Sequence, residues 1–350
     1  MTDLVLNEDL KALVNADLDI SSLKGKSVLV TGATGLIGSQ IVKLLASYNQ
    51  AQDANITVIA CVRNQAKAQR IFSELLMTEA IEIAIGDVNE KLCVDGAVDY
   101  IIHGASATSS QYFVSNPVET IMTALEGTRN VLELAREKKV AGVLYLSSLE
   151  VYGIPHKEGL ISESDYGYIE PLSVRSSYSE GKRMVECLCA SYTKEYQVPV
   201  KIARLSQTFG AGVEYNDGRV FAEFARCAIE GKDIVLHTEG KTVRTYCYTA
   251  DALSALLYIL IKGEAGEAYN VTNMDTAISI KDMAQLVCDT FPEAKIKVTF
   301  DLPDDIESFG FNPEMVIKLD STKLMKLGWQ PKTDLATMFK RVIRSMREDN

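Results

Sequence analysis

Hydrophobic residues along the chain form short continuous runs that alternate with longer stretches where apolar positions recur every three or four residues. The short runs are rich in valine and isoleucine, as in buried strands, whereas the longer period indicates helices packed on one face. Strands that alternate with helices predict a parallel sheet covered on both faces. We expect strands at 27–31, 56–62, 81–85, 100–103, 143–147 and 200–205, and helices at 36–47, 65–76, 117–138 and 176–196.

After residue 206 the pattern becomes irregular, because glycines divide the chain into loops. Helical periodicity returns at 220–230, 250–261 and 280–290. The pattern therefore predicts an α/β fold in which a doubly wound parallel sheet of the Rossmann type is interleaved with a smaller substrate-binding lobe. The expected division is an N-terminal leader at 1–25, a dinucleotide-binding core at 26–206 with a returning segment near 244–271, and a substrate-binding lobe at 207–243 and 272–350.

The charge of the chain argues against a nucleic-acid partner. The 350 residues include 47 acidic and 36 basic side chains, a formal net charge of −11, whereas binding to a phosphate backbone requires clustered positive charge. No apolar run reaches the ~18 residues that span a bilayer, and the acidic N-terminus is unlike a signal peptide. The seven cysteines lack metal-ligand spacing, so we expect reduced thiols, no metal, no membrane contact and a cytoplasmic protein.

A glycine-rich segment, Val28-Leu-Val-Thr-Gly-Ala-Thr-Gly-Leu-Ile-Gly38, joins the first predicted strand to the first predicted helix. In such a segment Gly32 permits the tight turn, Gly35 lets the backbone approach a pyrophosphate, and Gly38 lets the helix pack closely on the strand. The unpaired N–H groups at the helix start attract phosphate. The segment predicts a dinucleotide site that includes Gly32, Thr34, Gly35, Leu36, Ile37 and Gly38.

The end of the second strand bears on the choice between NAD and NADP. An acid is expected there for the ribose hydroxyls of NAD, but the sequence reads Ala60-Cys-Val-Arg63. An arginine fits the 2′-phosphate of NADP, and an ordinary solvated arginine is an equal alternative, so NAD is expected with NADP left open. Asp87 and Val88, which follow the third strand, are candidates for the adenine contact.

Tyr178 and Lys182 are four residues apart in a predicted helix, which places the phenol and the ammonium on one face. A phenol with an ordinary pKa of about 10 is a weak base at neutral pH, and we expect the neighbouring cation to lower that pKa. Tyr178 can then remove a proton from a sugar hydroxyl as hydride leaves the same carbon. Ser148 is predicted at the carboxyl end of the fifth strand, where ligands bind, and its hydroxyl can bond the reacting oxygen.

Further short motifs follow the glycine segment: His103-Gly-Ala-Ser106, Tyr112-Phe-Val-Ser-Asn116-Pro117, Glu150-Val-Tyr-Gly153, Tyr178-Ser-Glu-Gly-Lys182-Arg183, Asn216-Asp-Gly-Arg219-Val220, Thr242-Val-Arg244-Thr-Tyr246 and Leu327-Gly-Trp329-Gln-Pro331. With them, residues 26 to 335 resemble the extended short-chain dehydrogenases/reductases, in the group of NAD-dependent epimerases, dehydratases and decarboxylases. Within that group the motifs of the chain are most similar to those of UDP-glucuronate decarboxylases.

The resemblance implies an enzyme that holds NAD and modifies a nucleotide-sugar through a transient 4-keto sugar. It implies that Ser148, Tyr178 and Lys182 form a catalytic triad and that Glu150 is a further functional acid. It also implies a homodimer in which the helices at 117–138 and 176–196 pair with their copies. The substrate contacts that it implies are Ser106, Tyr112, Gln207, Arg219 and Arg244.

The chain also departs from the family pattern. Leu149 stands where dehydratases carry an acid and decarboxylases usually a serine, Gln207 replaces an asparagine at the substrate phosphates, and Ala124 replaces another asparagine. Glu150, Arg244 and the number of matching segments still make decarboxylation the leading hypothesis, and a UDP-sugar 4-epimerase or a nucleotide-sugar 4,6-dehydratase is the alternative. A reductase that consumes NADPH also stays open. A non-catalytic dinucleotide sensor is disfavoured, because a sensor has no need of a phenolate.

Overall fold

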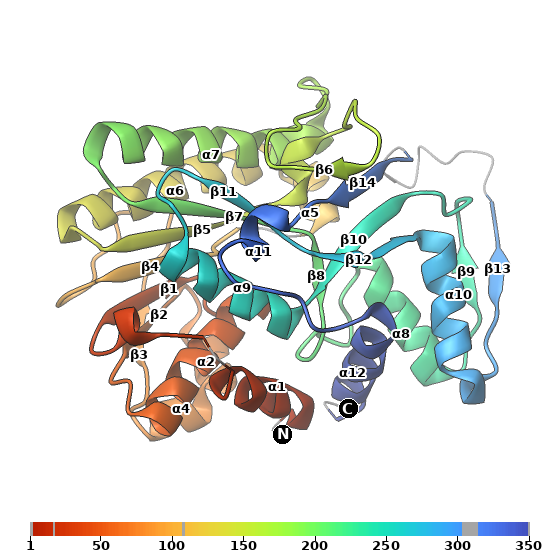
Figure 1. The fold of residues 1–350 in the computed structure, drawn as a ribbon, viewed down its shortest axis with the longest axis horizontal. Helices are drawn as coiled ribbons and strands as arrows, with labels where there is room; N and C mark the ends of the chain where they lie inside the picture. The colour runs from red at the N-terminus through yellow and green to blue at the C-terminus, as the bar shows by residue number, and fades with distance from the viewer. Residues whose placement is uncertain (1–2, 17, 107–108, 303–313, 349–350) are drawn as a thin grey trace.

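The computed structural model describes residues 3–16, 18–106, 109–302 and 314–348. A seven-stranded parallel sheet forms the larger lobe, with helices on both faces (Figure 1). Its strand order is β11-β7-β5-β4-β1-β2-β3, so the order reverses between β1 and β4. This confirms the predicted doubly wound Rossmann sheet. The strands are β1 (Ser27–Thr31), β2 (Thr57–Val62), β3 (Glu82–Ile85), β4 (Tyr100–His103), β5 (Gly142–Ser148), β7 (Val200–Leu205) and β11 (Ala268–Val271).

Alternate side chains of the central strands face opposite helical layers, as the pleat of a strand requires. On β1, Val28 and Val30 lie in a buried cluster with side chains of α1, α2 and α9, whereas Leu29 lies in a second cluster with side chains of α6 and α7. The sheet is thus apolar on both faces, as in other parallel sheets. The helices are α1 (Leu4–Val14), α2 (Leu36–Gln52), α6 (Pro117–Lys138), α7 (Ser177–Tyr196) and α9 (Thr249–Lys262).

The predicted strands agree with the observed ones to within one residue, but three other features differ from the prediction. The helix expected at 36–47 continues to Gln52 as α2. The helix expected at 65–76 is divided into α3 (Gln65–Ile71) and α4 (Ser73–Met77). At the break, Phe72 is buried in the core, and its backbone leaves the helical region with φ −114°. The edge strand β11 was not among the predicted strands, because its sequence Ala-Tyr-Asn-Val lacks the run of β-branched residues that marks the others.

The smaller lobe is built around a second sheet in which β10 is central. The chain enters this lobe directly from β7, returns to the large sheet through α9 and β11, and leaves it again as β12. The lobes are therefore interleaved, as predicted. The remaining strands are β6 (Leu160–Ile161), β8 (Gln207–Phe209), β9 (Ile234–Leu236), β10 (Val243–Tyr248), β12 (Asn273–Ser279), β13 (Val298–Phe300) and β14 (Val316–Leu319), and the helices are α5 (Ser110–Ser115), α8 (Val220–Glu230), α10 (Ile280–Thr290), α11 (Thr322–Met325) and α12 (Leu335–Glu348), with single 3₁₀ turns η1 (Ser21–Leu23), η2 (Leu149–Tyr152), η3 (Val174–Ser176) and η4 (Pro292–Ala294).

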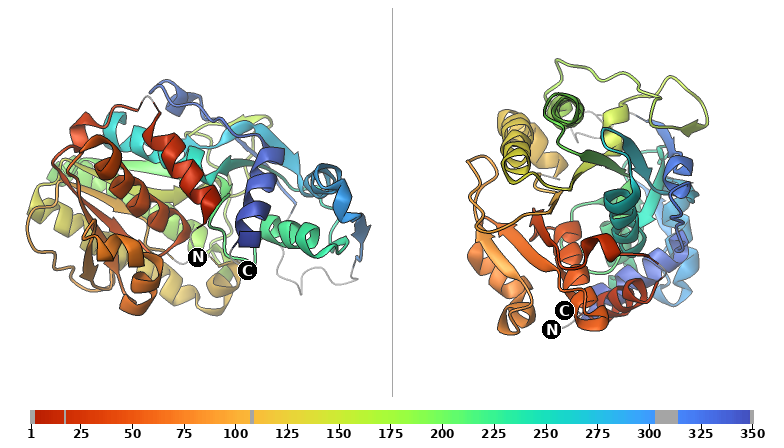
Figure 2. Two further views of the ribbon diagram at one scale, coloured as in Figure 1. Left: turned by 90° about the horizontal axis from the view of Figure 1, so that it is seen from below. Right: turned by 60° about the vertical axis from the view of Figure 1, so that its left-hand side comes forward.

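The first 25 residues, which we predicted as a leader without an assigned role, contain the packed helix α1. Its apolar side chains lie in the main core, and the helix contacts α2, α9 and α12 (Figure 2). The buried Asp9 carboxylate accepts hydrogen bonds from the Tyr248 hydroxyl and from Nη2 of Arg341, the latter at 2.7 Å. Helix α1 thus joins the large sheet to α12 of the smaller lobe. Among the described residues, no helix combines the length and apolarity needed to cross a bilayer.

The packing of α1 predicts that its buried face stabilises the whole protein. Leu10 is 5% exposed, whereas Leu4 at the start of the same helix is 54% exposed. We expect Leu10→Ala to lower the free energy of unfolding by about 2–5 kcal/mol, because the substitution leaves a cavity, and Leu4→Ala to change it by less than about 0.5 kcal/mol. Urea unfolding would measure both, and equal effects would contradict the packing described.

Candidate active site

The glycine segment forms a tight turn between β1 and α2 at the point where the strand order reverses. Gly32 has φ 67°, and a Cβ added there would lie 2.6 Å from the carbonyl carbon of Gly104 after β4. A Cβ on Gly38 would lie 2.3 Å from the carbonyl oxygen of Gly32. Side chains at these two positions would force the turn apart, so the predicted reasons for glycine agree with the geometry. The turn and the first N–H groups of α2 suit a pyrophosphate.

A cleft of about 650 Å³ extends from this turn along the carboxyl ends of the strands. It brings together nearly all the residues predicted for the site; only Asp87 and Arg244 are not among those that line it. The predicted residues that do line it are Gly32, Thr34, Gly35, Leu36, Ile37, Gly38, Arg63, Val88, Ser106, Tyr112, Ser148, Glu150, Tyr178, Lys182, Gln207 and Arg219.

The cleft is cationic although the protein is acidic. Among the described residues that line it, Glu150 is the acidic one, whereas the whole chain has more acids than bases. Such a lining attracts anions with several charges, such as dinucleotides and nucleotide-sugars. The basic residues of the lining are Arg63, Lys67, Arg175, Lys182 and Arg219.

Tyr178 and Lys182 lie in the first turns of α7 and face the cleft, as their spacing predicts. The Tyr178 ring stacks on Phe113 of α5, with centroids 4.2 Å apart and the rings within 10° of parallel. Nζ of Lys182 lies 5.7 Å from the Tyr178 ring centroid and donates to the carbonyl oxygen of Leu146 at 2.8 Å. Both side chains are therefore held by the end of β5 and by α5 before any ligand binds.

The pKa of Tyr178 shifts in the direction opposite to our expectation. Burial raises it to about 12, against a hydrogen bond from Ser148 that lowers it. Burial also lowers the pKa of Lys182 to about 8, against the negative charge of Glu186 that raises it. Spacing along the helix predicted that the two groups share a face, but it could not predict that both are shielded from water. The phenol is protonated at neutral pH in this environment.

Glu150 is oriented by groups from the start of α7. Its carboxylate accepts a hydrogen bond from Oγ of Ser179 at 3.1 Å and lies 3.7 Å from the guanidinium of Arg175. Its backbone N–H donates to Oγ of Ser148 at 3.3 Å, which ties the predicted acid to the predicted serine. The sequence analysis missed Arg175, which lies in η3, directly before the helix that was predicted to begin at residue 176.

Phe113 is the second residue of the cleft that the sequence analysis missed. We predicted its neighbour Tyr112 as a substrate contact; Tyr112 also lines the cleft but is 40% exposed, whereas Phe113 is 3% exposed. The Arg175 guanidinium lies 5.3 Å from the Phe113 ring, on which Tyr178 also stacks. Phe113 lies within the motif that begins at Tyr112, so the sequence marked this region. Only the fold shows that its ring stacks on the Tyr178 phenol.

The two predicted substrate arginines differ in their surroundings. Arg219 is partly exposed and forms an ion pair with Asp217 at 2.6 Å. Arg244 on β10 is 7% exposed, and its buried Nη1 has no hydrogen-bond partner among the described residues. Burial lowers the pKa of Arg244, and the charge of Glu150 acts in the opposite direction. A buried guanidinium nitrogen without a partner is costly, so this position is suited to a hydrogen-bond acceptor such as an anionic ligand.

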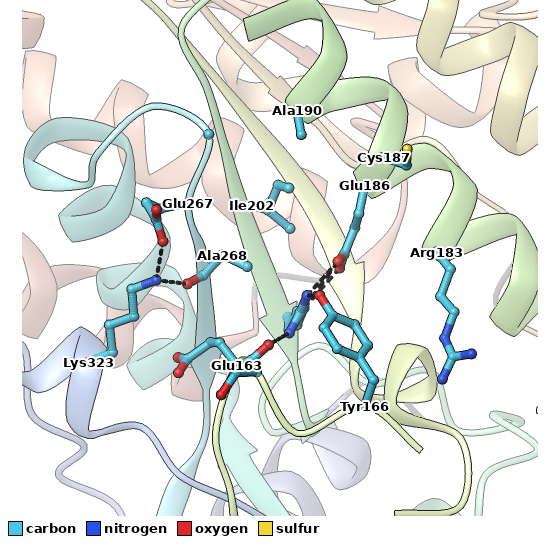
Figure 3. Close-up of a pocket in the computed structure, with 13 residues that line it drawn as sticks. Glu163, Tyr166, Arg183, Glu186, Cys187, Ala190, Ile202, Glu267, Ala268 and Lys323 are labelled. Carbon is cyan, nitrogen blue, oxygen red and sulfur yellow. Dashed lines mark hydrogen bonds and ion pairs between the residues drawn. The ribbon is translucent and has the colours of Figure 1, made fainter. Parts of the chain in front are cut away.

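A second cavity, of about 500 Å³, lies beside the edge strand β11 and its neighbour β7 and further along α7 (Figure 3). Arg204, only 2% exposed, forms a paired hydrogen bond with the Glu186 carboxylate, with its shorter N···O distance 2.6 Å. Glu186 also accepts from Oγ of Ser147 at 2.6 Å and lies one helical turn beyond Lys182. This buried ion pair therefore fixes the face of α7 that carries the ammonium.

Comparison with known proteins identifies the class of enzyme. Residues 28–272 match the profile of the NAD dependent epimerase/dehydratase family. The chain belongs to this family, which confirms the predicted class of enzyme and its type of cofactor.

Among curated relatives, the chain is similar to UDP-glucuronic acid decarboxylase 6 of Arabidopsis thaliana, with 32% identity over 88% of this chain and 85% of the relative. It is also similar to UDP-glucuronic acid decarboxylase 1 of Xenopus tropicalis, with 30% identity over 94% of this chain and 74% of the relative.

Solved structures share the fold. An epimerase from Methanothermobacter thermautotrophicus has a TM-score of 0.79 at 22% identity and covers 100% of this chain and 97% of its own. A UDP-glucuronic acid 4-epimerase from Bacillus cereus, solved with UDP-glucuronic acid and NAD, has a TM-score of 0.75 at 19% identity and covers 93% of this chain and 100% of its own.

The buried phenol and ammonium predict how turnover depends on pH. The reactive form needs an ionised phenol next to a charged ammonium, and the relevant pKa values are about 12 for Tyr178 and about 8 for Lys182. Below about pH 8 this form becomes roughly tenfold more abundant per pH unit, and above it the loss of the Lys182 proton cancels the gain. We expect kcat to rise with pH and then to level off, as steady-state kinetics would show. A kcat independent of pH from about 6 to 8 would contradict this.

A substitution in the second cavity provides a further check on that profile. Glu186→Gln removes the charge that raises the pKa of Lys182, so kcat should level off at a lower pH. Glu180→Gln, on the same helix but outside this ion pair, should leave the profile unchanged.

Proposed function

We propose that this protein decarboxylates UDP-glucuronate through a transient 4-keto sugar. The observation that carries the proposal is Arg244, a buried guanidinium with an unpaired Nη1 whose pKa responds to the charge of Glu150. A carboxylate on sugar C5 would provide the anion that such a position lacks. The similarity to UDP-glucuronic acid decarboxylases supports the same substrate.

In this proposal, Tyr178 removes the proton of the C4 hydroxyl, and Ser148 bonds the same oxygen. When bound, the nicotinamide cofactor would accept the hydride from C4 and later give that hydride back, so that no net oxidation would occur. Lys182, held by the carbonyl of Leu146, keeps a positive charge beside the phenol. The resulting C4 ketone makes the sugar a β-keto acid.

Loss of CO2 breaks the bond between C5 and the carboxyl carbon, and the electron pair moves toward the C4 ketone. A proton added at C5 and hydride added at C4 then give a UDP-pentose, while Tyr178 returns its proton to the C4 oxygen. Glu150 is the acid near this chemistry, and Ser179 and Arg175 fix its direction. We assign it to proton handling at C5.

The other predicted roles follow from positions in or beside the cleft. The glycine turn, Arg63 and Val88 would bind the dinucleotide, together with Asp87, which lies outside the lining but 3.6 Å from Arg63. Ser106, Tyr112, Gln207 and Arg219 would contact the nucleotide-sugar. We also propose that the smaller lobe binds the substrate; it includes the predicted segments 207–243 and 272–350 and also the rest of β10, to Tyr248, since β10 belongs to the second sheet. For the alternative reactions, a 4-epimerase does not require Glu150, and a 4,6-dehydratase would lack an acid at the buried Leu149.

Purified protein incubated with UDP-glucuronate should release CO2 and form a UDP-pentose, as mass spectrometry would detect. Tyr178→Phe should lower kcat by at least about 100-fold while dinucleotide binding persists, because only the proton acceptor is removed. A sensor would keep its function in this variant. Product from UDP-hexoses, with UDP-glucuronate unchanged, would support the epimerase instead.

The role of Arg244 can be separated from general damage to the site. Arg244→Met keeps a buried side chain of similar length without the charge. It should weaken binding of UDP-glucuronate by about tenfold or more, because a charge-assisted hydrogen bond is lost. Binding of UDP-glucose, which has no carboxylate, should change by less than about twofold. Equal losses for both ligands would assign Arg244 to the diphosphate and contradict our assignment.

We further propose that the protein is a homodimer formed through α6 and α7. These helices lie side by side (Figure 1) and expose Val118, Met122 and Met184, which are 66%, 39% and 57% exposed. Burying such apolar side chains against a second copy is favourable. Val118→Glu combined with Met184→Glu should convert the dimer to a monomer in light scattering. Met77→Glu, on the exposed α4, is the matched control, and a monomeric wild type would refute the proposal.

A cytoplasmic location is also part of the proposal. All seven cysteines are free thiols, and Cys61, Cys189 and Cys247 are buried. Unpaired buried thiols are typical of proteins in a reducing compartment. Cell fractionation tests this location, and recovery of the protein in a secreted fraction would rule it out.

A further inference from the structure

The side chains after β2 form a small group at one end of the cleft, which we call the β2 rim: Arg63, Asn64 and Lys67. All three line the cleft next to Cys61 and Val62. Arg63 and Lys67 offer only hydrogen-bond donors. Oδ1 of Asn64 accepts from the backbone N–H of Lys67 at 2.9 Å, so its Nδ2 group is left as a donor. The side chains of the rim therefore present mainly N–H groups and no carboxylate.

This arrangement does not fit the ribose of NAD. In this fold a carboxylate at the end of the second strand accepts hydrogen bonds from the ribose hydroxyls. Residues 57–67 contain no aspartate or glutamate, and the acid of the described lining, Glu150, follows β5 rather than β2. A ribose hydroxyl at the rim would therefore find no carboxylate to accept its proton.

The nearest carboxylate, Asp87, is already directed toward the rim cation. Its Oδ2 lies 3.6 Å from Nη1 of Arg63, and its Oδ1 accepts from the backbone N–H of Asn89 at 3.0 Å. The side chains of Arg63 and Asp87 are 71% and 35% exposed. An ion pair as exposed as this is weak, so a group with two negative charges can displace Asp87 from the guanidinium.

We propose that the β2 rim binds the 2′-phosphate of an adenosine ribose, so that the chain prefers NADP to NAD. The oxygens of a phosphate accept hydrogen bonds, and the planar guanidinium of Arg63 can donate to two of them. Lys67 adds a second charge, and Nδ2 of Asn64 adds a neutral donor. The same glycine turn serves both cofactors, so the preference departs from the family's usual NAD without any change in fold.

The proposal is tested with fragments that differ by one phosphate. Isothermal titration should show that adenosine 2′,5′-bisphosphate binds at least about tenfold more tightly than AMP, and NADP correspondingly more tightly than NAD. Adenosine 3′,5′-bisphosphate, which has the same charge in another position, should bind less tightly than the 2′,5′ isomer. Because Arg63 is exposed and Lys67 is partly exposed to solvent, the preference should fall as salt is added.

The substitutions Arg63→Ala and Lys67→Ala should each reduce the preference for the 2′-phosphate, and the double substitution should abolish it. The affinity for AMP should change by less than about twofold in all three variants, because the proposal assigns the rim to the 2′-phosphate, which AMP lacks. Arg70→Ala is the matched control, since Arg70 lies one turn further along α3 and does not line the cleft.

Equal affinities for AMP and adenosine 2′,5′-bisphosphate, tighter binding of NAD than of NADP, or no detectable binding of the bisphosphate would each overturn the inference. So would a loss of affinity for both fragments in Arg63→Ala. These measurements contain no sugar nucleotide. A failure of the proposed decarboxylation would therefore leave this test unaffected, and the reverse also holds.

Discussion

The buried ammonium of Lys182 is the group on which the rest of the site depends. A cation inside the protein requires compensation, which here comes from the carbonyl of Leu146 and from the charge of Glu186 one turn away. Glu186 is held in turn by Arg204 at the wall of the second cavity. These contacts fix how the start of α7 is rotated about its helix axis. That rotation determines where the Tyr178 phenol lies relative to β5.

The cleft and the outer surface have opposite electrostatic character. A protein with net charge −11 repels a nucleotide-sugar over most of its surface. The basic lining of the cleft reverses that effect locally, and the buried Arg244 lies outside this lining, on the second sheet. Charges on a ligand would thus be recognised in sequence, first by exposed cations and then by a desolvated one.

Periodic patterns predicted the large sheet and the position of the phenol and ammonium, because both follow from local spacing. Other features depend on parts of the chain that are distant in sequence. Phe113 meets Tyr178 only when α5 and α7 come together, and the raised pKa of Tyr178 arises from burial that spacing does not reveal. Helix α1 was predicted only as a leader, because its acidic residues hide an apolar face that packs on α2 and α12.

The interleaving of the two lobes constrains how the molecule forms on the ribosome. The large sheet gains its edge strand β11 only near residue 271, after part of the second sheet has been made. Helix α1 leaves the ribosome well before α12, yet it pairs through Glu8 and Asp9 with arginines of that helix. Neither lobe can therefore complete its packing as a separate unit during synthesis, because α1 must wait for α12.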